Sequence, residues 1–122
     1  MATISSPRVP TIALWAFKAI IALAFLLFGA MKLAGAPMLV KEFDVLGLGQ
    51  GFRILTGVVE VVGAALLLIP ATFRLGALVL LAVSIGACIA QATRLHGDVI
   101  HTLVLIAATG FLSWRAWRPS AA

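Results

Sequence analysis

Charged side chains are scarce in this chain of 122 residues, where Asp, Glu, Lys and Arg together make up only 11%. In a soluble domain they make up about a quarter. Hydrophobic residues account for 63% of the chain, and its mean hydropathy is +1.18. This composition excludes a soluble globular domain and indicates an integral membrane protein, with the lipid bilayer as its first partner.

Cysteine is nearly absent, since Cys88 is the only one in the chain. A disulfide or dithiol chemistry within the chain is therefore excluded. The sequence also lacks the ligands of an iron–sulfur cluster and the glycine fingerprint of a dinucleotide-binding site. Any electrons that the protein handles would have to come from a partner.

Two further kinds of site find little support in the sequence. The formal net charge is +5, but the basic residues are spread over loops and the ends of apolar runs, so no nucleic-acid partner is expected. His96 and His101 lie five residues apart without a thiolate cluster or an HExxH spacing. We therefore expect no metal site.

Four apolar runs are long enough to cross a bilayer, which takes about 20 residues per helix. They cover residues 11–31, 52–69, 75–92 and 99–117. The sequence predicts an all-α transmembrane bundle of four helices as one domain, 11–117. A disordered lead is expected at 1–10 and a tail at 118–122. The first run has no clear cleavage site behind it, so we interpret it as a retained span.

A short amphipathic helix is predicted in the loop between the first two runs. Pro37 suits the first turn of a helix. Apolar residues then recur at helical spacing with charged residues on the opposite face, which is typical of a helix lying on the membrane surface. Gly47, Gly49 and Gly51 end it. A phosphate-binding loop would need a strand before these glycines and a lysine-bearing helix after them, and neither is present.

Basic residues also bear on topology. Lys and Arg divide evenly between the two sides of a four-span protein, but on one side they are interleaved with Glu42, Asp44 and Asp98. We therefore place both termini in the cytoplasm, in a multi-pass protein of the cytoplasmic (inner) membrane. Three tryptophans near the ends of the outer runs are expected to anchor that interface: Trp15, Trp114 and Trp117.

Glu60 lies near the middle of the second run. A carboxylate at the centre of a spanning helix costs roughly 2.5–3.5 kcal/mol, so it is expected to face the bundle interior and to have a partner. At about 1.5 Å per residue, Lys18 lies within roughly 5 Å of Glu60 in depth, which predicts a Lys18–Glu60 pair. If Lys18 instead reaches for the near surface, Lys32, Arg53 or a hydroxyl must serve Glu60.

Polar groups also gather around the end of the third run. Ser84, Cys88 and Gln91 share one helical face. Just beyond them come residues of mixed charge: Arg94, His96, Asp98 and His101. This end, opposite the termini, is a candidate site. For the two histidines, proton transfer or ligand binding stands beside the simpler interpretation as a loop residue and a capped interfacial one.

Several short motifs resemble the DoxX family, in particular its DoxX-like branch of small four-helix membrane proteins, over about residues 15–117. They are Phe28-Gly29-Ala30-Met31-Lys32-Leu33, Leu46-Gly47, Gly57 with Glu60, Gly63-Ala64, Leu66-Leu67-Leu68-Ile69-Pro70 and Gly86-Ala87. The family is named after a subunit linked to a membrane thiosulfate:quinone oxidoreductase, and relatives are associated with redox homeostasis or membrane-protein assembly. The resemblance places the family's lysine at Lys32 and its acid at Glu60. Gln91 stands where the pattern leads us to expect a histidine.

Two functions from different classes follow. In the first, the bundle binds a membrane quinone without a cofactor of its own, as a redox-linked enzyme or subunit, and Glu60 handles a proton. In the second, Glu60 and its cation form a structural lock in a subunit or assembly partner that packs on another membrane protein or a second copy. An enzyme acting on a lipophilic substrate by acid–base chemistry at Glu60 is a further alternative, and a transporter is less well supported.

The predicted site has Glu60 as its acid–base residue. The predicted ligand-binding residues are Lys18, Lys32, Arg53, Gln91, His96 and His101.

Overall fold

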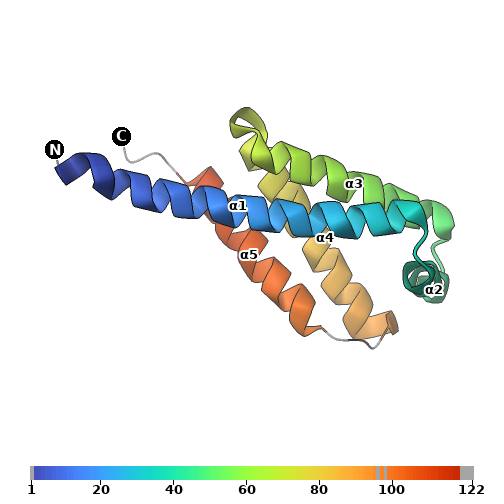
Figure 1. Ribbon diagram of the computed structural model, residues 1–122. Coiled ribbons are helices and arrows are strands. Elements are labelled where there is room, and N and C mark those ends of the chain that lie inside the picture. The colour runs from blue at the N-terminus through green and yellow to red at the C-terminus, as the bar shows by residue number, and fades with distance from the viewer. Residues whose placement is uncertain (1, 96, 98, 119–122) are drawn as a thin grey trace.

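The computed structural model describes residues 2–95, 97 and 99–118, and every element within them is helical (Figure 1). In chain order the elements are α1 (Ala2–Ala34), α2 (Pro37–Leu46), α3 (Gln50–Leu68), the short 3₁₀ helix η1 (Pro70–Thr72), α4 (Phe73–Ala90), the π-helical turn η2 (Gln91–Leu95) and α5 (Ile100–Trp117).

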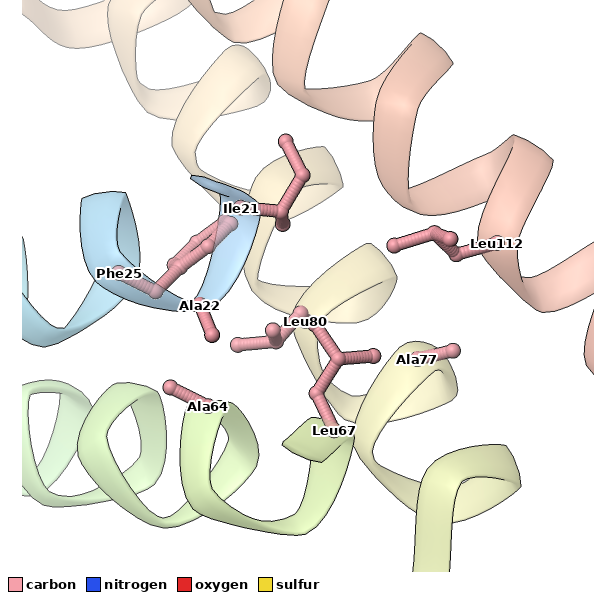
Figure 2. Packing of buried hydrophobic residues seen from close by; sticks show 8 residues of the cluster. All are labelled: Ile21, Ala22, Phe25, Ala64, Leu67, Ala77, Leu80 and Leu112. Atoms are coloured by element: carbon pink, nitrogen blue, oxygen red, sulfur yellow. The ribbon is translucent and has the colours of Figure 1, made fainter. Parts of the chain in front are cut away.

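The four long helices form two packed pairs, α1 with α3 and α4 with α5, and α3 also packs on α4. Figure 1 shows α4 and α5 crossing behind α1 at an angle rather than running parallel to it. The buried hydrophobic core lies where the helices meet, and all four contribute to it (Figure 2). Its members are Ile21, Ala22, Phe25, Ala64, Leu67, Ala77, Leu80 and Leu112.

Glycines bring the backbones of α1 and α3 into close contact. A Cβ atom on Gly29 would lie 2.7 Å from Val61 Cγ2 and 2.9 Å from the carbonyl oxygen of Gly57. A Cβ on Gly57 would lie 3.1 Å from the carbonyl oxygen of Gly29. Small residues allow such an approach between membrane helices. This contact sets the register in which α1 and α3 face each other.

Three helical segments are long and apolar enough to cross a membrane: Thr11–Ala34, Gln50–Leu68 and Pro70–Leu95. They match the first three predicted spans. Helix α5 has 18 residues and packs along α4, but it includes His101 and Arg115 and is not among these segments in the described chain. The fourth span, and with it the four-span bundle, stays a prediction.

Helix α1 begins at Ala2, where the sequence predicts a disordered lead over 1–10. The backbone of residues 2–10 is helical, and the lead as a unit separate from the bundle stays a prediction. A helix already formed by the apolar run extends at the gain of one hydrogen bond per residue. With 33 residues, α1 is about 50 Å long, whereas a hydrocarbon core is about 30 Å thick. Part of α1 therefore reaches beyond the apolar layer. Beyond Arg118, the predicted tail lies outside the described residues.

The short helix predicted after the first span is confirmed as α2. Pro37 is its first residue, and Gly47 caps it at φ 74°, a left-handed conformation that favours glycine. Phe43 is buried, whereas Lys41 and Asp44 are exposed. Helix α2 packs on α3 and on η2. Its position on a membrane surface stays a prediction.

We expect Gly29→Leu to lower the free energy of unfolding in detergent by about 1–3 kcal/mol or more, because the new side chain would force α1 and α3 apart. Gly110→Leu is the matched control, since a Cβ there would lie 3.9 Å from Leu81 Cδ1, an ordinary contact. Thermal unfolding of the two variants checks this. Equal stability of Gly29→Leu and Gly110→Leu would show that the α1–α3 approach is not a stabilising constraint.

Candidate functional site

A buried ion pair joins α1 to α3. The ammonium nitrogen Nζ of Lys32 lies 2.5 Å from Oε2 of Glu60, and the two side chains are 15% and 3% exposed. In a helix the Cα–Cβ bond tilts toward the N-terminus. Because α1 and α3 run in opposite directions (Figure 1), the two side chains lean toward each other. The register set by Gly29 and Gly57 thus brings this cation to this acid.

The second oxygen of the same carboxylate is left over. Oε1 of Glu60 is buried and has no hydrogen-bond partner in the part of the chain that the structure describes. A buried acceptor without a donor costs about 1–3 kcal/mol. The pair with Lys32 therefore satisfies only half of the carboxylate, and the other half is available to a donor from outside the chain.

Arg53 holds the end of α1 in place. Its Nη1 donates a hydrogen bond to the carbonyl oxygen of Lys32, and its Nε donates to Oε1 of Gln50 at 2.7 Å. Gln50 Nε2 in turn donates to the carbonyl oxygen of Val40 at 3.0 Å and to Oδ1 of Asp44 at 2.8 Å. An arginine that bonds the last carbonyls of a helix caps its C-terminus. This network ties α1, α2 and α3 together beside the ion pair.

A first cavity, of about 410 Å³, lies on one side of the pair between α1, α4 and α5, with α2 contributing at its rim. Its apolar wall includes Phe25, Phe28 and Met31 from α1 and Leu105 from α5. The polar and charged side chains that line it are Lys32, Glu42, Glu60, Ser84, Gln91, His101 and Thr102.

A second cavity, of about 540 Å³, lies between α2, α3 and α4. It shares four lining residues with the first: Lys32, Glu60, Val83 and Ala87. Glu60 therefore lies where the two cavities meet. Helix α4 contributes to the wall of both cavities through Val83 and Ala87. The buried carboxylate of Glu60 thus lies between two cavities, each large enough for a small molecule.

Gln91 enters the first cavity from the π-helical turn η2, where α4 ends. Gly97 lies close to this side chain, since a Cβ atom there would displace the side-chain oxygen of Gln91. Single π-helical turns are frequent at functional sites, because the wider turn changes the direction of side chains. Here the turn carries Gln91, whose side-chain amide the sequence predicts to bind a ligand.

The structure brings four of the predicted site residues together. Lys32, Glu60, Gln91 and His101 all line the first cavity. Arg53 lies behind them, bonded to the backbone of Lys32 and lining neither cavity. His96 lies outside the described residues.

The predicted Lys18–Glu60 pair is wrong. Lys18 Nζ lies 3.7 Å from the ring centroid of Phe73 and 4.4 Å from that of Trp15, while Lys32 takes Glu60. The prediction compared depths measured from the ends of the two apolar runs. The real register is set by Gly29, which lies eleven residues, or about 16 Å along the helix, beyond Lys18.

Sequence reasoning missed part of the lining. Phe28 and Met31 belong to a motif of the family resemblance, and Met38 lies in the predicted short helix, but nothing in the sequence identified these three as a cavity wall. Glu42, a charged residue of the same short helix, also lines the first cavity. The spacing of Phe25, Phe28 and Lys32 on one face of α1 is the signal that could have found the wall.

Comparison with known proteins places this geometry in a family. The model of the DoxX-like family matches residues 16–114. The chain belongs to the DoxX-like family. No curated protein and no solved structure matches it. The matched residues of this DoxX-like protein include the ion pair and the lining of both cavities. Among the described residues, no group of three or more His, Cys, Asp or Glu side chains is placed to hold a metal ion.

We expect Lys32→Met to lower the free energy of unfolding by about 3 kcal/mol, because it leaves the carboxylate of Glu60 buried without a cation. In the double variant Lys32→Met/Glu60→Gln the loss should be smaller than the sum of the two single losses, with a coupling of about 1–3 kcal/mol. Thermal unfolding in detergent measures the cycle. Lys41→Met, on the exposed face of α2, is the control. Strictly additive losses would show that the two side chains do not stabilise each other.

Proposed function

We propose that this DoxX-like protein binds a lipophilic small molecule with a polar head group at Glu60, and that the ligand belongs to the membrane quinones and quinols. The observation that carries the proposal is the buried, unpartnered Oε1 of Glu60 at the junction of two cavities. A ligand hydroxyl would satisfy this oxygen. The apolar walls suit a ring that comes from the bilayer.

The neighbouring groups fit both oxidation states of such a ligand. A quinol hydroxyl would donate a hydrogen bond to Oε1 of Glu60. A quinone carbonyl would accept one from Lys32 or from the Gln91 amide across the first cavity. Oxidation of a quinol releases two protons and two electrons. Glu60 would receive one proton and His101, which lines the same cavity, would receive the other. The two electrons would pass to a redox protein, which is why we assign the chain the role of a subunit or assembly partner.

The same observation favours ligand binding over a purely structural lock. A lock requires the contact between Lys32 and Glu60 and nothing beyond it. Such a lock would be more stable with both carboxylate oxygens bonded inside the protein. Among the described residues, one oxygen is instead left without a donor, although two hydroxyls line the same cavity as Glu60. Both bond elsewhere: Thr102 Oγ1 donates to the carbonyl oxygen of Val99 at 2.6 Å, and Ser84 Oγ donates to that of Leu80 at 2.8 Å.

We expect a soluble short-tailed benzoquinol to raise the stability of the purified protein, by about 2.7 kcal/mol at a concentration 100 times its dissociation constant. Glu60→Gln should lose much of this stabilisation, because a neutral amide oxygen accepts a weaker hydrogen bond from the ligand hydroxyl than a carboxylate does. Thermal unfolding with and without ligand measures both, each variant against its own ligand-free value.

Asp44→Asn is the control for the loss of a carboxylate. Asp44 is exposed and lines neither cavity, and an asparagine keeps the oxygen that accepts from Gln50. A Glu60→Gln protein that is stabilised as strongly as the wild type would separate the ligand from Glu60 and reject the proposed site.

We also propose that the termini face the cytoplasm, in the inner membrane. The support is a group of cations and tryptophans at the end of the molecule where α4 begins and α5 ends. Arg74 lies over the ring of Trp117 at 4.2 Å, and Trp117 Nε1 donates to the carbonyl oxygen of Arg74 at 3.1 Å. Arg118 lies 4.9 Å from the ring centroid of Trp114. Basic residues prefer cytoplasmic loops, and tryptophan prefers the interface.

Labelling of single cysteines tests this orientation. In a Cys88→Ser background, Leu48→Cys should react with a membrane-impermeant maleimide on intact cells, because it is exposed in the loop on the other side. Ala71→Cys, in the turn between α3 and α4, should react only after the membrane is permeabilised. The reverse pattern would place the termini outside.

A further inference from the structure

The two helices that flank the second cavity touch at one end and separate at the other. Near the turn between α3 and α4, a Cβ on Gly63 would lie 2.8 Å from Leu80 Cδ2, and a Cβ on Gly76 would lie 2.8 Å from the carbonyl carbon of Leu66. Further along α4, a Cβ on Gly86 would meet no atom within 4 Å. The space between α3 and α4 therefore widens toward the end where α2 lies.

The α4 wall of this space is smooth. Ala82, Gly86 and Ala90 follow one another at four-residue spacing, so they stand on one face of the helix, and all three line the second cavity. Gly86 and Ala82 are exposed. On the facing side lie Phe52 and Thr56 from α3. We call this space the α3–α4 groove, defined by these five residues.

Polar groups are few along the α3–α4 groove. The hydroxyl of Thr56 already donates to the carbonyl oxygen of Arg53 at 3.0 Å, and that of Thr93, near the outer end, donates to the carbonyl oxygen of Ile89 at 2.6 Å. Beside the shared ion pair, the first cavity carries Gln91 and His101, whereas the second carries Arg94, which follows Thr93 in the chain and is not one of the five residues of the groove. The two spaces therefore differ in chemistry: the first suits a polar ring, and the groove suits hydrocarbon.

We propose that the α3–α4 groove holds the linear hydrocarbon tail, isoprenoid or alkyl, of the ligand whose head group lies at Glu60 in the first cavity, and that the ligand enters from the bilayer along this groove. The inference rests on the proposed function, because it needs a ligand at Glu60. Three observations support it. Glu60 lines the cavity to which the groove belongs, the groove wall is exposed at Gly86, and the one hydroxyl among the five residues that define the groove, that of Thr56, is already bonded.

The test compares two ligands with the same head, a decyl-substituted benzoquinol and the same ring carrying a methyl group. Gly86→Leu places a side chain in the groove without a clash at Cβ, and leucine is a better helix former than glycine. We expect Gly86→Leu to weaken binding of the decyl ligand by about tenfold or more, since at least two methylenes lose their contact. Binding of the methyl ligand should change by less than about twofold.

Gly110→Leu, on α5 and away from both cavities, is the matched control and should leave both affinities unchanged. Ala82→Leu, one turn earlier on the same wall, should repeat the tail-selective loss, and it decides the matter if Gly86→Leu does not fold. Isothermal titration in detergent measures the affinity of each protein for each of the two ligands.

The outcomes separate the two proposals. If wild type binds the methyl ligand but Gly86→Leu and Ala82→Leu bind the decyl ligand as tightly as wild type does, the head site stands and the tail route is wrong. If both variants weaken the two ligands equally, the groove does not recognise the tail and the inference is again overturned. If wild type binds neither ligand, the proposed function fails, and this inference fails with it.

Discussion

The close approach of α1 and α3 is the constraint on which the rest of the structure depends. Gly29 and Gly57 leave no room for a side chain between the two backbones, so the helices meet in one register. That register brings the ammonium group of Lys32 to Glu60 inside an apolar bundle. Without a cation within reach, a carboxylate at this depth would be strongly destabilising. Packing of small residues thus determines where a charge is tolerated.

The arrangement of small residues also explains why space remains around the pair. Gly63 and Gly76 hold α3 and α4 together near η1, and the hydrophobic core fills the region where all four long helices cross. Beyond that region the helices diverge, and the cavities lie between them. Helix α2 and the hydrogen bonds of Arg53 connect the diverging ends. The part of the bundle near η1 is therefore closely packed, and the part near α2 has room for a ligand.

The helices and the burial of Glu60 could be predicted, because they depend on the spacing of residues that are close together in the sequence. Periodicity identified the long helices, and the position of Pro37 and the glycines after it identified α2. Glu60 stood out because a lone acid in an apolar run must face protein. Sequence spacing could not identify its partner. Lys18 and Lys32 lie on one stripe of α1, fourteen residues or about 21 Å apart along the helix. The choice between them depends on how far α1 is shifted along α3, which only a tertiary contact determines.

The sequence by itself determined that the chain is an all-helical membrane protein of the DoxX-like family with one acid buried in its second long helix, because composition, helical period and motif are properties of neighbouring residues. Only the tertiary structure decided that Lys32 pairs with that acid, that one carboxylate oxygen has no partner among the described residues, and that two cavities meet beside the pair. These features depend on the register and the crossing of helices, which are set by contacts between residues far apart in the chain.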